Sequence, residues 1–276
     1  MADVKLYLAE REERRQKNRR RFRIGVAGIV GVAILIGSFW LALRSPFVAV
    51  QEIRITGNVR IPRDEIEHAL LGAFGGRSLI ARMIGLHHVF AWPGHLVVER
   101  PDFLPELERI EITRRFFARR IDVSVTEREP AGIWCLRKKD PVQCFWFAKD
   151  GALYAPSPEA EGSLIYTISD YASEGVSAGS AALLEDEMRR VMEILNVLSV
   201  SGLRMREIRY EDPALQELRV ATYDGPSLYF SLRFSPAYAA EAIRSLREDD
   251  AAGKLHPAFS ALQYVDFRVE NRVYYQ

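Results

Sequence analysis

The sequence is poor in the residues and motifs on which many enzymes and metal proteins depend. It has two cysteines and five histidines in 276 residues, and 38 lysines and arginines almost balance 37 acidic residues. None of the Gly-x-Ser-x-Gly, His-Glu-x-x-His, glycine-rich phosphate-loop or calcium-loop motifs occurs. A chain without excess positive charge also offers no broad surface for a phosphate backbone. We therefore expect no enzyme activity, no cofactor, no metal site and no nucleic-acid partner.

The histidines that lie closest together in the sequence are His87, His88 and His95. No pattern of cysteines or carboxylates accompanies them, as a zinc site would require. We expect these histidines at the surface rather than as metal ligands.

A long apolar run occurs near the beginning of the chain. Residues 24–43 contain no charge, amide or histidine and lie between Arg23 and Arg44. A helix of this length spans about 30 Å, which is one bilayer core, and the run is too long for a signal peptide. Basic residues are concentrated before it, in the tail 1–23. The pattern predicts an uncleaved single-pass membrane helix, with the tail in the cytoplasm and the remaining chain outside it.

Residues 44–128 have the pattern of a small module. Pro62 suits the first turn of a helix, and apolar residues from Ile66 to Phe74 recur at steps of three and four. We place a further helical stretch within residues 77–108, so the expected order is β-α-α-β-β. Alternating apolar and polar residues predict the three strands, around 53–56, 110–113 and 121–126.

Residues 129–276 form a second module that is richer in strands. Cys135 and Cys144 flank a segment that can fold into a hairpin with Lys139 and Asp140 at its tip, and this pairing places the two cysteines opposite each other. We predict a disulfide, which an oxidising compartment permits; the alternative is two free buried thiols. The expected remaining elements are a mostly irregular stretch over 155–180, a helix over 184–198, three strands, a helix from about 236 and a terminal strand.

Three segments carry a resemblance to a known family. They are the strand that ends in Gly57-Asn58, the segment Val123-Ser124-Val125-Thr126-Glu127-Arg128-Glu129-Pro130, and the closing Tyr264-Val265-Asp266-Phe267-Arg268-Val269. In this order, and over nearly the whole chain, they resemble the FtsQ/DivIB family of bacterial cell-division proteins. The resemblance implies an α+β protein in which a single transmembrane helix precedes a POTRA-like β-α-α-β-β domain and a C-terminal mixed β domain with flanking helices. It further implies a non-catalytic divisome scaffold in the cytoplasmic membrane at the division septum, which links cytoplasmic and extracytoplasmic division proteins.

The resemblance also implies a partner site at the end of the chain. FtsQ-like proteins bind FtsB, and with it FtsL, by adding a partner segment beside their last strands, where an edge strand offers unpaired backbone groups. In residues 262–275 apolar side chains share one face of a strand, while charges of alternating sign line the other. These charges would select the partner, or else protect the edge against unwanted pairing. The expected partner-binding residues are Tyr264, Asp266, Phe267, Arg268, Val269, Glu270, Arg272, Val273, Tyr274 and Tyr275.

Two other classes of protein compete with this interpretation. A POTRA-bearing envelope export or chaperone component would use the same edge pairing, although it would be expected to carry tandem POTRA units or a terminal β-barrel. The third class is an anchored cell-wall enzyme whose catalytic residues are too dispersed to form a recognisable motif.

Overall fold

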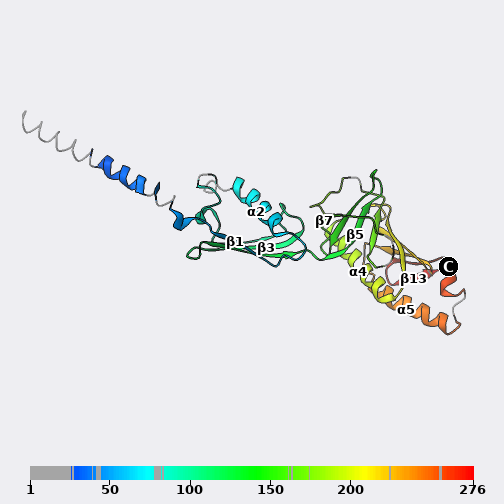
Figure 1. Ribbon diagram of the computed structural model, residues 1–276. Helices are drawn as coiled ribbons and strands as arrows, with labels where there is room; N and C mark the ends of the chain where they lie inside the picture. Colours follow the sequence, from blue (N-terminus) through cyan, green and yellow to red (C-terminus); the bar gives the residue numbers. More distant parts are fainter. Residues whose placement is uncertain are drawn as a thin grey trace, which may run out of the picture. The chain divides into compact units, whose positions relative to one another are not determined.

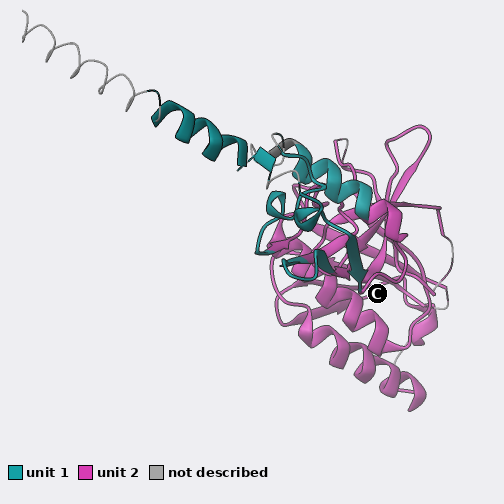
Figure 2. Cartoon of the chain, turned by 60° about the vertical axis from the view of Figure 1, so that its left-hand side comes forward, with its two compact units in different colours: residues 1–56, 67–96, 111–123 teal, residues 57–66, 97–110, 124–276 magenta. Residues whose placement is uncertain are grey.

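The computed structural model describes residues 26, 28–38, 40–41, 45–77, 82, 84–160, 162, 164–173, 175–223, 225–254 and 257–276 (Figure 1). The chain divides into two compact units, which Figure 2 shows in different colours. Unit 1 comprises residues 1–56, 67–96 and 111–123, and unit 2 comprises residues 57–66, 97–110 and 124–276. The predicted basic tail, residues 1–23, lies outside the described residues.

A four-stranded sheet runs in the order β1-β4-β3-β2. Its strands are β1 (Glu52–Thr56), β2 (His95–Glu99), β3 (Leu107–Arg115) and β4 (Arg120–Glu127), and helix α2 (Arg63–Arg77) follows β1 in the chain. Apolar side chains alternate along β3 and β4, and Ile110, Ile112, Ile121 and Val123 are fully buried. The predicted positions of these three strands and of the first helix are confirmed.

The second helical stretch predicted within residues 77–108 is short in the part of that range that the structure describes. Helical residues there are confined to Arg77, 82 and 84 and to the short 3-10 helix η2 (Val89–Ala91), and strand β2 follows. Val97 and Val98 in β2 are β-branched, which favours an extended backbone over a helix. The module therefore also contains a strand, β2, that was not predicted.

A nine-stranded sheet lies in unit 2 and runs in the order β13-β12-β11-β10-β9-β8-β5-β6-β7. Figure 1 labels β5, β7 and β13 of this sheet. Its strands are β5 (Pro130–Leu136), β6 (Gln143–Ala148), β7 (Leu153–Ser157), β8 (Thr167–Asp170), β9 (Met205–Tyr210), β10 (Glu217–Thr222), β11 (Ser227–Ser231), β12 (Tyr264–Val269) and β13 (Arg272–Tyr275). Helix α4 (Glu185–Ser201) connects β8 to its parallel neighbour β9, and helix α5 (Ala237–Ala251) connects β11 to its parallel neighbour β12. Parallel neighbours require such crossovers, since a short hairpin can join only antiparallel strands.

Both helices pack on one face of this sheet and close the main core. Val191, Ile194 and Leu195 of α4 and Ile243 of α5 are almost completely buried in one cluster with the sheet. The period of apolar residues along α4 places these side chains on one side, and the helix ends where Gly202 adopts a left-handed backbone with φ of 67°. The helices predicted over 184–198 and from about 236 are confirmed.

The predicted fold class needs correction, because the structure is a mixed α/β protein with a four-stranded and a nine-stranded sheet. The sequence interpretation identified most elements of unit 2. It did not identify the parallel pairings β5–β8, β8–β9 and β11–β12. Parallel pairing joins segments that are distant in the chain, so local alternation does not reveal it.

The predicted membrane span over residues 24–43 also needs correction. Residues 26, 28–38, 40 and 41 are helical and exposed, and positions 24, 25, 27, 39, 42 and 43 lie outside the described residues. Within the part of the chain that the structure describes, no helix is both long and apolar enough to cross a bilayer. The predictions of a single-pass protein and of its place in the cytoplasmic membrane are therefore not supported.

Candidate functional site

The predicted partner site is a β-hairpin at one end of the nine-stranded sheet, rather than the single terminal strand that was expected. Strands β12 and β13 are antiparallel and are joined by Glu270 and Asn271. Asn271 has φ of 57°, a left-handed conformation that asparagine tolerates better than most residues and that tight hairpin turns require. The register pairs Val265 with Tyr275, Asp266 with Tyr274 and Val269 with Arg272.

Phe267, one of the predicted partner-binding residues, belongs to the core. Its side chain is 1% exposed and stacks on Phe230, with ring centroids 5.1 Å apart. The ring of Tyr238 from α5 meets it edge-on at 6.1 Å. Phe267 therefore anchors β12 beneath the hairpin and is not accessible to a partner.

The other predicted residues divide between half-buried and exposed positions. Tyr264, Asp266 and Val273 are half-buried. Val269, Tyr274 and Tyr275 are exposed, at 43%, 48% and 48%. The remaining exposed members of the predicted set are Arg268, Glu270 and Arg272.

The charged row on β12 is paired within the protein. The Arg268 guanidinium donates to Asp266 at 2.6 Å and to Glu217 of β10 at 2.9 Å, and it lies 4.9 Å from the ring centroid of Tyr229. Burial alone would raise the pKa of Asp266, but the hydrogen bonds from Arg268 outweigh it and lower that pKa. Arg268 and Asp266 are therefore held in place by contacts within the protein, next to the edge strand β13.

Tyr238 attaches the hairpin to helix α5. Its hydroxyl lies 2.8 Å from the Phe267 carbonyl and 2.9 Å from the Val269 carbonyl, so its single proton is shared between two acceptors at the end of β12. Burial raises the pKa of Tyr238, and the nearby charges of Asp266 and Glu270 act in the same direction. The hydroxyl thus stays protonated and can keep donating.

Strand β13 is the outer strand of this edge. The backbone of Gln276 faces β12, since its N–H lies 3.3 Å from the Tyr264 carbonyl and its carbonyl lies 3.4 Å from the Tyr264 N–H. Backbone groups alternate in direction along a strand. The N–H and C=O of Val273 and Tyr275 therefore point away from β12, towards the open side of the edge.

The opposite edge of the sheet is covered by the chain itself. The Leu153 N–H in β7 donates to the Ser180 carbonyl at 2.9 Å, and the Gly179 N–H donates to the Leu153 carbonyl at 2.7 Å. Pro156, also in β7, has no N–H to offer. Both features protect this edge against strand addition.

The two cysteines lie near this covered edge. Cys135 of β5 pairs directly with Cys144 of β6, and the structure joins them in a disulfide with a Cα–Cα distance of 4.0 Å. Ile133 shares their buried cluster, and Trp146 and Ala160 pack against it. The disulfide therefore fixes the register of the β5–β6 hairpin. In the order of the sheet, five strands lie between β5 and β13 at the opposite edge.

Glu127 and Arg128, noticed in the sequence only as part of the family resemblance, organise a segment of unit 2. The Glu127 carboxylate accepts hydrogen bonds from three successive backbone amides, those of Val59, Arg60 and Ile61, at 2.7–3.0 Å. Burial alone would raise the pKa of Glu127, but these amide hydrogen bonds outweigh it and lower that pKa. The carboxylate thus holds the segment that precedes α2.

Arg128 is 5% exposed and is fully engaged within unit 2. Its guanidinium donates to Asp150 at 2.6 Å and to the Pro105 carbonyl at 2.8 Å. Burial alone would raise the pKa of Asp150, but the hydrogen bond from Arg128 outweighs it and lowers that pKa. The arrangement is a structural ion pair between the buried Arg128 and the half-buried Asp150. Local alternation along a strand does not reveal a partner as distant as Asp150.

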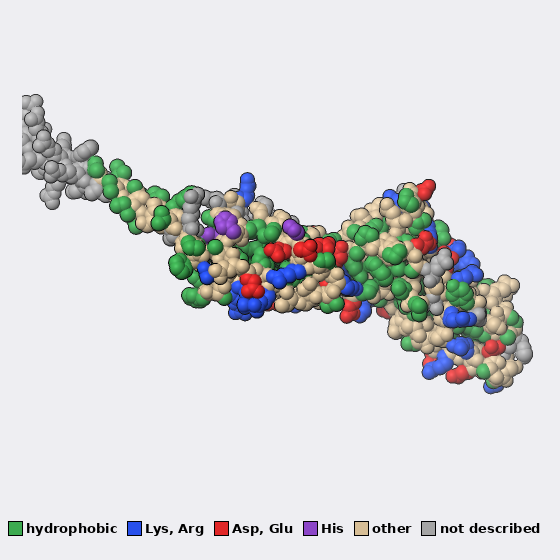
Figure 3. All heavy atoms as spheres, in the orientation of Figure 1, with side chains coloured by type: hydrophobic (Ala, Val, Ile, Leu, Met, Phe, Trp, Pro, Cys, Tyr) green, Lys and Arg blue, Asp and Glu red, His purple; other side chains and the backbone are tan. Residues whose placement is uncertain are grey.

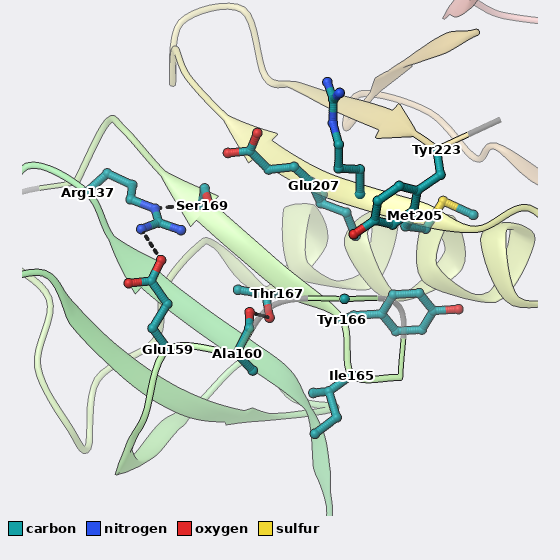
Figure 4. Close-up of a pocket in the computed structure, with 13 residues that line it drawn as sticks. Arg137, Glu159, Ala160, Ile165, Tyr166, Thr167, Ser169, Met205, Glu207 and Tyr223 are labelled. Atoms are coloured by element: carbon teal, nitrogen blue, oxygen red, sulfur yellow. Dashed lines mark hydrogen bonds and ion pairs between the residues drawn. The ribbon is translucent and has the colours of Figure 1, made fainter. Parts of the chain in front are cut away.

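A polar cavity of about 290 Å³ lies on the sheet around β8 and β9 (Figure 4). At its margin the Arg137 guanidinium donates to Ser169 at 3.1 Å and pairs with Glu159. Tyr166, Thr167 and Glu207 also line it. The charges of Arg137, Glu159 and Glu207 are paired with protein groups, and Arg206 also lines the cavity.

Ser169 and Glu207 are a serine and a carboxylate that lie close together in this cavity. Ser169 lies beside the Arg137 guanidinium, and the carboxylate near it, Glu207, has a lowered pKa. Burial alone would raise the pKa of Glu207, but hydrogen bonds from Arg209, Ser169 and Tyr171 outweigh it. A general base for serine needs a pKa near neutrality, so Glu207 is poorly suited to that role.

The histidine prediction is only partly correct. His95 is exposed, whereas His88 is 2% exposed and its Nδ1 accepts a hydrogen bond from the Phe90 amide at 3.2 Å, at the start of η2. His88 thus has a local structural role. Among the described residues no group of three or more histidines, cysteines or carboxylates is arranged to hold a metal ion.

Comparison with known proteins does not assign the chain to a family. No model of a known protein family matches it, and no curated protein sequence matches it either. The functional interpretation therefore rests on the geometry of the β12–β13 edge and on the residues that form it.

Proposed function

We propose that this chain is a non-catalytic scaffold of the bacterial divisome that captures an FtsB/FtsL-like segment by strand addition along β13. The observation that carries the proposal is the open edge at β13, where Val273 and Tyr275 direct backbone donors and acceptors outward. The closing residues, which resemble those of the FtsQ/DivIB family, support the choice of partner class.

The two edges of the sheet support β13 as the binding strand. A partner strand that approached β7 would meet the hydrogen bonds between Leu153 and residues 179–180, together with Pro156. At β13 it meets a regular strand that follows a tight turn and lacks proline.

The side chains around β13 would read the sequence of the partner. Backbone hydrogen bonds contribute affinity but do not distinguish one strand from another, so selection falls to the exposed Val269, Arg272, Tyr274 and Tyr275. Arg272 is hydrogen-bonded to Tyr274, and this contact raises the pKa of Arg272. Because Asp266 and Arg268 already pair with each other, we assign them to the support of the strand rather than to direct recognition.

A proline substitution in β13 tests the proposal. Val273→Pro removes an outward N–H and preserves the inward hydrogen bonds of β13, so we expect affinity for the co-expressed FtsB-like and FtsL-like proteins of the same organism to fall at least about a hundredfold. Val273→Thr is the matched control, because threonine keeps the N–H and the β-branched shape. Equal affinities for the two variants, with native circular dichroism spectra, would rule out strand addition at this edge.

Hydrogen exchange provides a second, direct test. On addition of the partner, the amides of Val273 and Tyr275 should become at least tenfold better protected, whereas that of Tyr274, which faces β12, should change little. Partner binding that leaves the Val273 and Tyr275 amides unprotected would locate the interface elsewhere.

A further inference from the structure

The β3–β4 hairpin of unit 1 ends in an exposed aromatic turn. Its residues 116–119 connect β3 to β4, and the Arg119 N–H donates to the Phe116 carbonyl at 3.0 Å. Phe117 is 98% exposed and Phe116 is 39% exposed. Exposure of two adjacent phenylalanine rings to water is unfavourable, and exposed apolar side chains of this kind are typical of an interaction site.

A row of aromatic contacts supports this turn from below. The rings of Phe116 and Phe117 lie 5.5 Å apart, and Phe116 lies 5.2 Å from Phe90. The Arg114 guanidinium lies 5.6 Å from the Phe90 ring centroid and donates to the Trp92 carbonyl at 3.0 Å. The exposed rings therefore contact Phe90, which is itself 44% exposed and is held by Arg114 beside the buried Trp92.

A further exposed phenylalanine, Phe47, lies at the same end of unit 1. The Arg119 guanidinium donates to the Pro46 carbonyl at 3.2 Å, and the Gln51 N–H donates to the Arg119 carbonyl at 2.8 Å. Both contacts hold the 3-10 helix η1 (Pro46–Val48) beside the turn. Phe47 within η1 is 79% exposed, so the turn and η1 together present apolar rings at one end of the unit.

Arginines flank these rings on both strands. The sequence reads Arg114-Arg115-Phe116-Phe117-Ala118-Arg119-Arg120, and the nearest carboxylate on the hairpin is Asp122. Arg115 and Arg120 share it, at 3.1 and 2.6 Å, and the hydrogen bond from Arg120 is the main reason that the pKa of Asp122 is lowered. Glu52 of β1 also acts on Arg120, so two carboxylates lie among the four guanidinium groups and the end of the hairpin keeps a net positive charge. Figure 3 shows hydrophobic and basic side chains together on the surface of this unit.

We infer that the end of this hairpin docks on an anionic lipid surface, with Phe117 and Phe47 entering the headgroup region and the flanking arginines binding lipid phosphates. Aromatic side chains next to basic ones are typical of proteins that bind the surface of a bilayer. A guanidinium group can also donate two parallel hydrogen bonds to the oxygens of one phosphate. A narrow turn also suits a fluid surface, which needs no complementary shape, better than it suits a protein partner. The contact is peripheral, and it is independent of the strand addition proposed for β13.

A probe at the turn tests this inference in the full chain. Ala118→Cys introduces a single reactive thiol beside Phe117, because Cys135 and Cys144 are joined in the disulfide. The thiol is labelled with a nitrobenzoxadiazole dye and the protein is mixed with vesicles that contain 30% phosphatidylglycerol in phosphatidylcholine. The matched control carries the same dye at Leu164→Cys in unit 2, where the native side chain is fully exposed. A local probe is needed because the exposed apolar residues between 26 and 41 could bring the chain to a vesicle by themselves.

We expect the dye at position 118 to shift to the blue and to become severalfold less accessible to iodide, while the dye at position 164 changes little. Phe117→Ser should raise the lipid concentration at half-maximal response roughly tenfold. Arg115→Glu should raise it by a similar factor and remove the preference for phosphatidylglycerol over pure phosphatidylcholine vesicles. The matched control, Arg244→Glu on α5, replaces an arginine of similar exposure and should have no effect.

Three outcomes would overturn the inference. The first is a dye at position 118 that stays accessible to iodide while the chain sediments with the vesicles. The second is an equal response of the dye to phosphatidylglycerol-containing and pure phosphatidylcholine vesicles in the chain without charge substitutions, which would show that the arginines do not bind anionic lipid. The third is a blue shift that depends on protein concentration in the absence of vesicles, which would show that a second copy of the chain covers the turn.

Discussion

At β7 the nine-stranded sheet ends in a strand that contains Pro156 and is bonded to residues 179 and 180, whereas at β13 it ends in a short strand that directs the backbone of Val273 and Tyr275 outward. The β7 end is also cross-linked by the Cys135–Cys144 disulfide. Edge strands invite unwanted pairing, and proteins usually cover or interrupt them. A sheet that is protected at one edge and left open at the other can add a strand in one place only.

Of the variants that test the difference between the two edges, the largest effect is expected at Phe267, the buried residue that anchors β12 next to the open edge. Phe267→Ala removes a ring that is 1% exposed and stacked on Phe230, so we expect the free energy of unfolding to fall by about 3–5 kcal/mol. Urea denaturation measures this loss. Tyr275→Ala, at a position that is 48% exposed, serves as the control and should lose about 1 kcal/mol or less. Similar losses for the two variants would mean that β12 is not anchored as described.

Reduction of the disulfide should weaken the covered edge without affecting the open one. The link joins residues nine positions apart, and a loop of that size is worth about 2–3 kcal/mol of unfolding free energy. We expect Cys135→Ser/Cys144→Ser to lose this amount in urea denaturation and to keep its affinity for the FtsB-like partner within about twofold. A large loss of affinity at a temperature where the variant remains folded would show that the two edges are coupled.

Acid should weaken the open edge through Asp266. Its pKa is lowered in the folded protein, so the ionised carboxylate adds stability above its unfolded pKa of about 3.9, and this stability is lost as the pH falls through the lower folded value. The contribution should be about 1 kcal/mol, because Arg268 is 38% exposed and partly screened by water. The difference in unfolding free energy between the natural chain and Asp266→Asn should be constant from pH 6 to pH 5 and should shrink below pH 4. A difference that grows on acidification would contradict the sign of this shift.

The smallest effect is expected at Pro156. Pro156→Thr adds an N–H to β7, but residues 179 and 180 still occupy the backbone of Leu153 in the same strand. We expect partner affinity to change less than about twofold and the chain to remain in the same oligomeric state, as judged by sedimentation velocity. New self-association would show that the proline alone protects this edge.

Local patterns in the sequence predicted most elements of the fold. The alternation along β3 and β4 and the helical period along α4 each follow from a single segment that packs one face against the core. The hairpin between Cys135 and Cys144 could be predicted for the same reason, because its two strands are adjacent in the chain.

What the sequence did not reveal depends on distant contacts or on weak turn signals. The break at Glu270-Asn271 was missed because it contains no glycine or proline, although asparagine at a left-handed position was a usable sign. The charges at Asp266 and Arg268 looked available in the sequence, yet Glu217, which lies 51 residues earlier, binds Arg268. The parallel pairing of β11 with β12 was equally invisible, since it requires the intervening helix α5 to fold back across the sheet.

The parallel pairing of β11 with β12 also affects the order in which parts of the sheet fold. The two strands of the β12–β13 hairpin are adjacent in the chain, but a two-stranded hairpin is only marginally stable alone. Strand β12 joins the sheet through pairs such as Ser227 with Tyr264, and forming these pairs closes a long segment of chain. Closing such a segment is slow relative to the formation of a hairpin. The open edge should therefore become rigid only after α5 has docked and Tyr238 has reached the carbonyls of β12. A partner that recognises the completed edge would in this way select chains that have finished folding from those that have not.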